Sequence, residues 1–275
     1  MTKIEQWNTY WRSRGLTPPP TTISTRLNRY GQLYEYYTLF SWDGERMLPY
    51  QWIACDDSSF TRRDFSNAEC EAWGIRATHL RLYIPAPIRP SLKEAVYFCE
   101  GAPDALTFQE MGLFGVGLHH NLSIKDKMVQ AEILRVLRIM QPIEVYAAPD
   151  GDKPNIWNRK QDNVYYWTQI WQSLVPGVKF LDWRKLMLPA IRCYEKSCID
   201  FWKAQRCSMD ASADKALWQA CGDKVDANQM WQKTRCDFSR FGRLLKEIGT
   251  DLPTFPNVEF LTAKRQRSIE KRELS

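Results

Sequence analysis

The hydrophobic pattern predicts two short buried strands around which the chain is organised. Residues 96–99 (VYFC) form an apolar, β-prone run that ends at Glu100, and residues 143–147 form a second run that leads into 150–152 (DGD). Each run is too short for an independent helix and is bounded by glycine or proline, which is typical of interior strands of a parallel sheet. Ligands of such sheets bind at the carboxyl ends of the strands. We therefore expect the acidic residues to meet at one edge of the sheet.

Alternating strand and helix patterns predict an α/β fold for the middle of the chain. After the strand at 96–99, a helix is expected to begin near Pro103, since proline suits the first turn of a helix. A strand at 114–118, an amphipathic helix at 123–140 and a helix at 164–174 follow. We therefore predict a parallel sheet that is built from right-handed βαβ units and flanked by helices.

The N-terminal part has a different pattern and is predicted to be a small α+β subdomain over residues 1–90. A helix at 3–14 precedes two aromatic-rich strands at 33–42 and 46–55, and a further strand is expected at 78–87. Prolines at the end of this last strand and after it interrupt regular structure and place the domain boundary near residue 90.

The remaining boundaries follow from helical patterns beyond residue 90. Residues 91–235 are predicted to form the sheet domain, with a helical insertion at about 185–221. A helix is expected at 229–248, and its later part joins a highly charged tail in a C-terminal segment at 236–275.

The expected meeting of Glu100, Asp150 and Asp152 has a chemical consequence. At ~4 Å, two carboxylates repel each other by about 4 kcal/mol at an effective dielectric constant near 20. Such a cluster persists if one acid is protonated or if a cation neutralises it. Oxygen ligands at an open edge suit Mg²⁺ or Mn²⁺, which keep several waters and bridge to a substrate phosphate. We interpret the acids as a Mg²⁺ site, with Mn²⁺ as the other candidate ion.

These residues also carry a resemblance to a known family. The stretch 100–106 (EGAPDAL), followed by DGD at 150–152, resembles the Toprim domain of primases, topoisomerases and related nucleases, and the phage, plasmid and bacterial primase branch in particular. Residues 224–228 (KVDAN) resemble the K-D-A-N element of those primases, with one extra residue, Val225. The resemblance covers roughly half of the chain. It implies four metal ligands: Glu100, Asp104, Asp150 and Asp152.

The resemblance implies Mg²⁺-dependent nucleotidyl transfer that makes a short RNA primer during DNA replication, with Glu100, Asp150 and Asp152 as catalytic residues. In that reaction the metal ions assist both the attacking and the leaving oxygen, and Glu100 is also a candidate general base. The chain departs from full-length primases in lacking a CxxC zinc ribbon and a GxxxxGK[ST] helicase motif.

Two alternatives use the same scaffold. A Toprim-type nuclease would employ the same acids with water as the nucleophile, and the sequence does not separate it from a primase. A non-catalytic nucleic-acid-binding or adaptor protein would retain only the fold. A topoisomerase is disfavoured because 275 residues leave no room for strand-passage domains.

Basic residues near the acids favour a polyanionic partner. The net charge is +6 and the pI is about 8.8, and arginine and lysine hold a nucleic-acid backbone through counterion release. Single-stranded DNA, NTPs and a helicase or another replication protein are the expected partners; for each basic residue the alternative is an ordinary solvated surface. The candidate nucleic-acid-binding residues are Arg62, Arg63, Lys153, Arg159, Lys160 and Lys224.

Neither a run of 18 apolar residues nor a signal peptide is present in the sequence, so we expect no membrane association and take the cytoplasm as the default location. The eight cysteines are irregularly spaced. In this setting we expect reduced and mostly buried thiols rather than disulfides.

Overall fold

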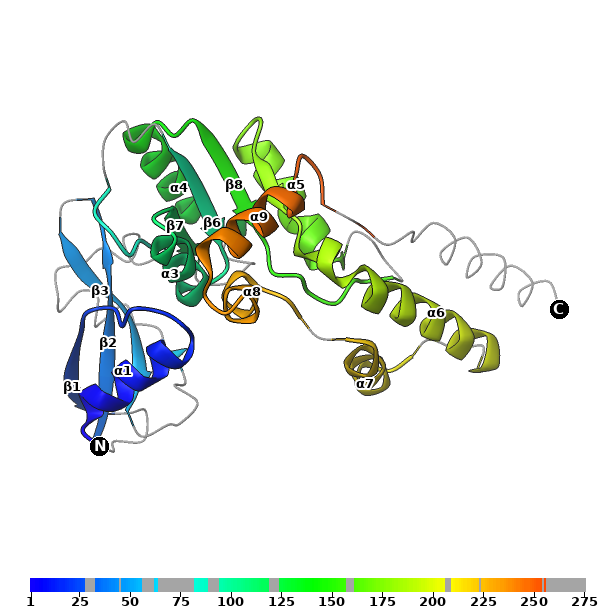
Figure 1. The fold of residues 1–275 in the computed structure, drawn as a ribbon, viewed down its shortest axis with the longest axis horizontal. Helices are drawn as coiled ribbons and strands as arrows, with labels where there is room; N and C mark the ends of the chain where they lie inside the picture. Colours follow the sequence, from blue (N-terminus) through cyan, green and yellow to red (C-terminus); the bar gives the residue numbers. More distant parts are fainter. Residues whose placement is uncertain are drawn as a thin grey trace. The chain divides into compact units, whose positions relative to one another are not determined.

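The structure is a computed structural model. The chain forms two compact units: Met1–Tyr146 with Ala227–Gly242, and Ala147–Asp226 with Arg243–Ser275. Figure 1 shows the ribbon of the chain with its main helices and strands labelled. Each unit combines segments from distant parts of the sequence. The sequence pattern predicts three consecutive domains, 1–90, 91–235 and 236–275, and this division stays a prediction. The residues described are 1–27, 33–44, 46–55, 62–63, 82–88, 94–118, 124–156, 161–205, 209–222, 224–253 and 255.

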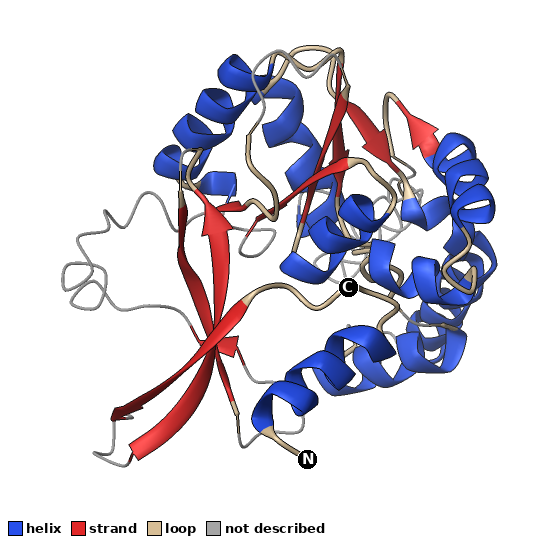
Figure 2. Ribbon diagram, turned by 60° about the vertical axis from the view of Figure 1, so that its left-hand side comes forward, coloured by secondary structure: helices blue, strands red, loops and turns tan. Residues whose placement is uncertain are grey.

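The first unit begins with a four-stranded antiparallel sheet in the order β1-β2-β3-β4, whose long strands are drawn in red in Figure 2. Strands β2 (Leu33–Trp42) and β3 (Met47–Ala54) confirm the two aromatic-rich strands. Strand β1 (Thr21–Leu27) was not expected, because its TTISTRL sequence has too few apolar positions to predict a strand. The edge strand β4 (Arg62–Arg63) is two residues long.

Helix α1 (Lys3–Ser13) confirms the predicted N-terminal helix and packs through its tryptophans. Trp7 and Trp11 are buried, and the ring centroid of Trp7 lies 4.9 Å from that of Tyr37 on β2. The Trp7 indole N–H donates a hydrogen bond to the carbonyl oxygen of Pro19 at 2.9 Å. The aromatic face of the helix and the proline segment after it therefore hold α1 in place.

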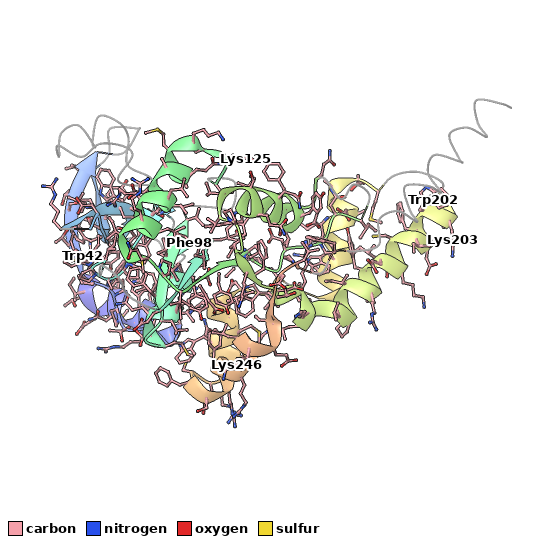
Figure 3. The ribbon with its side chains drawn as sticks, turned by 90° about the horizontal axis from the view of Figure 1, so that it is seen from above. Trp42, Phe98, Lys125, Trp202, Lys203 and Lys246 are labelled. Atoms are coloured by element: carbon pink, nitrogen blue, oxygen red, sulfur yellow. The ribbon has the colours of Figure 1, made fainter. Side chains whose placement is uncertain are left out.

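The parallel pair predicted around Glu100 is present in the first unit. Strand β6 (Ala95–Cys99) pairs in parallel with β7 (Phe114–Leu118), and helix α3 (Ala102–Glu110) connects them. A Cβ atom at Gly115 would lie 2.4 Å from the Ala105 carbonyl oxygen, so the glycine lets α3 approach the strand closely. Phe98, labelled in Figure 3, is fully buried on β6.

Helix α4 (Lys127–Met140) follows β7 and leads to strand β8 (Glu144–Ala148), in which the chain passes from the first unit to the second. The helix begins four residues later than predicted, because the Asp126 side chain accepts a hydrogen bond from the Met128 N–H and caps it there. Ile143, expected inside the strand, is 70% exposed and precedes it.

Most of the described residues of the second unit lie in helices. Helix α5 (Asn163–Leu174) is followed by strand β9 (Lys179–Leu181) and the 3₁₀ helix η4 (Trp183–Met187). Helices α6 (Leu188–Gln205) and α7 (Ala211–Cys221) lie in the range 185–221, which is predicted to be a helical insertion. Trp202 and Lys203 mark the last turns of α6 in Figure 3.

The predicted helix at 229–248 is in fact two helices. Helix α8 (Ala227–Lys233) belongs to the first unit, and α9 (Phe238–Ile248) begins after a break. Arg235 and Cys236 have φ angles of 58° and 54°, left-handed conformations that end a helix.

The second sheet is mixed rather than purely parallel. Its strand order is β10-β9-β8-β6-β7-β5. Strand β5 (Leu82–Tyr83), the described part of the strand expected at 78–87, runs antiparallel to β7, and β10 (Gly249–Thr250) runs antiparallel to β9. The chain is thus an α/β protein whose parallel strands are flanked by helices. None of the helices in the described ranges has both the length and the apolar character needed to cross a membrane.

Candidate functional site

The DGD segment forms a tight turn just after strand β8. The Asp152 N–H donates to the carbonyl oxygen of Asp150 at 2.8 Å, and the Gly151 N–H donates to that of Val225 at 2.7 Å. A Cβ atom at position 151 would lie 2.7 Å from Sδ of Met187 and 3.0 Å from the Val225 oxygen. Glycine therefore suits this position, because a methyl group would make tight contacts with the Val225 backbone and with the Met187 side chain.

The two carboxylates of this turn share one cation. The ammonium group of Lys224 forms an ion pair with Asp150 and lies 3.8 Å from Oδ1 of Asp152. Asp150 is 6% exposed, and burial raises the pKa of its carboxyl group to about 6. Lys224 opposes this rise in pKa, whereas the charges of Asp226 and Asp152 add to it. Two further carboxylates and one ammonium group therefore act on the charge of Asp150.

A buried ion pair holds the chain that follows the turn. The guanidinium of Arg184 binds both carboxylate oxygens of Asp162 at 2.9 Å, and both side chains are almost fully buried. Arg184 also donates to the carbonyl oxygen of Asp152 at 3.2 and 3.1 Å. Asp162 in turn accepts the N–H groups of Asn155 and Tyr165. Arg184 thus ties the DGD turn to the start of α5.

Neither Arg184 nor Asp162 was singled out from the sequence. An arginine and an aspartate separated by 22 residues carry no motif, and each is an ordinary surface residue in most proteins. A weak local signal did exist, since Asp162 directly precedes a helical pattern and aspartate is a preferred N-cap.

The other two predicted ligands lie in the first unit. Glu100 directly follows β6 and is half-buried, whereas Asp104 lies in the first turn of α3 and is 7% exposed. An Asp104 oxygen accepts the backbone N–H of Asn228 at 3.0 Å. Asp104 therefore has a structural partner of its own at the start of α8, in addition to the favourable interaction of its charge with the N-terminus of α3.

Asn228, the last residue of the KVDAN segment, is the centre of a buried polar network. Its amide group donates to the Thr107 hydroxyl at 3.1 Å and to the Arg14 carbonyl oxygen at 3.3 Å. Its side-chain oxygen accepts from Gln232 at 2.7 Å. These bonds connect α1, α3 and α8, so this residue has a structural function in the first unit.

Asp150 and Asp152 supply carboxylate oxygens of the type that Mg²⁺ takes as ligands. Among the residues that the structure describes, no three His, Cys, Asp or Glu side chains are arranged to hold a metal ion. Mg²⁺ is commonly bound by one or two carboxylates, with waters and substrate phosphates as the remaining ligands. Two carboxylates that already converge on an ammonium group fit this mode of binding.

Of the six basic residues predicted to contact nucleic acid, the structure describes the side-chain contacts of two, Lys153 and Lys224. Lys153 forms an ion pair with Asp214 on α7, which also accepts the hydroxyl of Tyr194, and Lys224 pairs with Asp150. Arg62 and Arg63 lie on β4, and their side chains are outside the described part of the structure. Arg159 and Lys160 also lie outside the described residues.

Comparison of the chain with protein-family models, with curated proteins and with solved structures finds no match to any of them.

Proposed function

We propose that this chain is a Toprim-type, primase-like enzyme that transfers nucleotides by Mg²⁺-dependent phosphoryl transfer. In this proposal, single-stranded DNA is the template, NTPs are the substrates, and a helicase or another replication protein is the partner. Support comes from the sequence pattern EGxxDAL…DGD together with its context, since one motif follows strand β6 and the other follows strand β8.

The observation that carries the proposal is the convergence of Asp150 and Asp152 on one cation. Buried carboxylates are costly unless a positive charge accompanies them, and here the ammonium group of Lys224 supplies it. A tight turn with glycine at its centre presents both acids to that cation. We infer that a metal ion takes the place of this ammonium group.

Asp150 and Asp152 are the proposed metal ligands in the second unit, and the family pattern adds Glu100 and Asp104. When bound, Mg²⁺ would stabilise the charge on the attacking and leaving oxygens of the phosphoryl group. Arg184 fixes the backbone of Asp152 and so orients the turn. Lys224 is the internal counter-ion that must leave Asp150 for a metal ion to bind there, and once released it is available to a phosphate.

The test is an assay of the full chain with end-labelled single-stranded DNA, NTPs and either Mg²⁺ or Mn²⁺. Primer synthesis that is lost in Asp150→Asn and in Asp152→Ala is the expected result. Asp200→Asn is the matched control, because Asp200 is exposed on α6 and pairs only at the surface with Lys203. Metal-dependent shortening of the DNA, without synthesis, would replace primase by nuclease.

One observation favours the non-catalytic alternative. Asp104 accepts the N–H of Asn228 and Asp150 pairs with the ammonium of Lys224, so both acids have a partner within the chain. An adaptor that needs only the fold would bind nucleic acid equally well before and after Asp152→Ala, in the presence or absence of Mg²⁺. Binding of this kind, combined with neither synthesis nor cleavage, would overturn the enzymatic proposal.

A further inference from the structure

Two cysteines that the sequence separates meet between helices α6 and α7. The Sγ atoms of Cys193 and Cys221 lie 2.8 Å apart, and both thiols are free. A covalent S–S bond is ~2.05 Å long, so a small approach of the two sulfurs is enough for a bond to form. Cys193 is exposed and Cys221 is half-buried, so a small reagent can reach the pair.

The packing of the two helices holds these thiols together. Tyr194 on α6 contacts Trp218 on α7 with ring centroids 5.4 Å apart, and it donates its hydroxyl to Asp214. A Cβ atom at Gly222 would lie 2.5 Å from Cβ of Ala190, so the end of α7 approaches α6 closely. On α7, the residues Asp214, Trp218 and Cys221 are spaced by four and then three positions, so they lie on one face of the helix.

We propose that Cys193 and Cys221 are a reversible thiol–disulfide pair that a low-molecular-weight disulfide, such as oxidised glutathione, closes. The thiolate of Cys193 attacks one sulfur of the reagent, whose S–S bond breaks and releases one thiolate. The thiolate of Cys221 then attacks Sγ of Cys193 and releases the second. Two protein thiols are thereby oxidised by two electrons, the reagent is reduced to two thiols, and the protons pass to the released thiolates.

The surroundings assign the order of these two steps. Cys193 is the exposed thiol and meets the reagent first, whereas burial and the neighbouring Cys193 raise the pKa of the Cys221 thiol. Cys198, five residues along α6, is fully buried, and burial raises its pKa to about 12, so it does not compete.

A disulfide between Cys193 and Cys221 would affect the DGD turn, because Cys221 is close in sequence to Lys224. Lys224 follows Cys221 by three residues and forms the ion pair with Asp150. A bond between α6 and the last residue of α7 anchors the chain three residues before Lys224 and so restrains its ammonium group near the turn. Weaker Mg²⁺ binding by the oxidised chain follows from this, and that effect rests on the proposed function, whereas the disulfide itself does not.

The test begins with the full chain treated with oxidised glutathione. Titration of thiols under denaturing conditions is expected to fall from eight to six per chain, and peptide mapping without reductant is expected to join Cys193 to Cys221. The variant Cys221→Ser should instead retain glutathione on Cys193, and Cys236→Ser, which alters a half-buried thiol of the first unit, should leave the disulfide unchanged. Disulfides to other cysteines, or glutathione stably bound to Cys193 in the unsubstituted chain, would overturn the proposal.

Calorimetry of Mg²⁺ binding to the oxidised and reduced chain then tests the consequence separately. Weaker binding after oxidation, abolished in Cys193→Ser, supports the link to Lys224. If the mapped disulfide forms but Mg²⁺ binds neither form, the proposed function fails and the redox pair stands. If Mg²⁺ binds both forms equally, the link between the disulfide and the acidic turn is refuted.

Discussion

Replacement of Arg184 by methionine removes the positive charge that holds the DGD turn to the start of α5. The arginine is almost fully buried and binds both oxygens of Asp162 at 2.9 Å. It also supplies two hydrogen bonds to the carbonyl oxygen of Asp152. Methionine fills a similar volume, so the substitution tests the loss of charge and hydrogen bonds rather than the creation of a cavity.

The magnitude follows from what remains around Asp162. Removing one partner of a buried ion pair costs about 3–5 kcal/mol, because a buried charge is left without compensation. Asp162 still accepts two backbone N–H groups, those of Asn155 and Tyr165, which places the expected cost near the lower end of this range. We therefore expect the free energy of unfolding to fall by about 3 kcal/mol, or the Tm by roughly 6–12 °C.

Denaturant unfolding of four proteins measures this coupling: the unsubstituted chain, Arg184→Met, Asp162→Asn and the double variant. The double variant should lose less stability than the two single losses together, because neither charge is then left unpaired. Arg192→Met is the control, since Arg192 lies on an exposed position of α6 and should change stability by less than about 0.5 kcal/mol. Additive losses, or an Arg184→Met protein as stable as the control, would refute the reasoning.

Three further substitutions test other parts of the structure. Gly151→Ala should destabilise the chain by about 1–3 kcal/mol in denaturant unfolding, whereas Gly242→Ala, in an uncrowded position of α9, should stabilise it by about 0.5–1 kcal/mol. The pKa of Asp150 is about 6 in the folded chain, above its ordinary value of 3.8, so the folded chain holds this proton more tightly than the unfolded chain. The stability that this group contributes is therefore fully present below pH 3.8 and is lost as the pH rises through about 6. Asp150→Asn should therefore remove a pH dependence on the order of 2–3 kcal/mol between pH 4 and pH 7, and an unchanged slope of stability against pH would contradict this assignment. Asn228→Ala should lower the free energy of unfolding by about 1–3 kcal/mol, because it removes the hydrogen bonds of the buried Asn228 side chain to Thr107, to the Arg14 carbonyl oxygen and to Gln232. A smaller loss in thermal unfolding would show the network to be dispensable.

The strands and the acidic turn were predictable because their signals are local. A short apolar run bounded by glycine or proline identifies a buried strand wherever the chain later places it, and the bounds of β7 match the prediction at both ends. Asp104 was likewise expected in the first turn of a helix that carries proline at its start, and the structure confirms this. No contact with a distant segment was needed to predict either element.

The missed elements depend on partners elsewhere in the chain. Strand β1 is polar in sequence and becomes a strand because β2 pairs with it along its whole length. The break between α8 and α9 contains no proline or glycine, the usual signals, since Arg235 and Cys236 adopt the left-handed conformation themselves. Tertiary packing therefore decides both features, and local propensity does not.

The partners of the basic residues were not predictable either. The proximity of Lys153 and Lys224 to the acidic motif favoured a nucleic-acid contact, but each lysine pairs with an aspartate of its own unit. A positive charge next to an acidic motif has two interpretations from sequence alone, because the same charge attracts an external phosphate or an internal carboxylate. Only the folded arrangement shows which carboxylates each lysine reaches.

Val225 in the KVDAN segment has a structural role that affects its neighbours. It is buried, and its carbonyl oxygen accepts the N–H of Gly151, so this residue pairs with the DGD turn. That bridge sets the position of Lys224 immediately before it, where the ammonium group reaches Asp150. Three residues after Val225, the Asn228 N–H binds Asp104. One short segment therefore supplies a partner to an acid in each unit. Because the bridge and the ion pair are made by adjacent residues, Val225 and Lys224, a change in one is expected to alter the other.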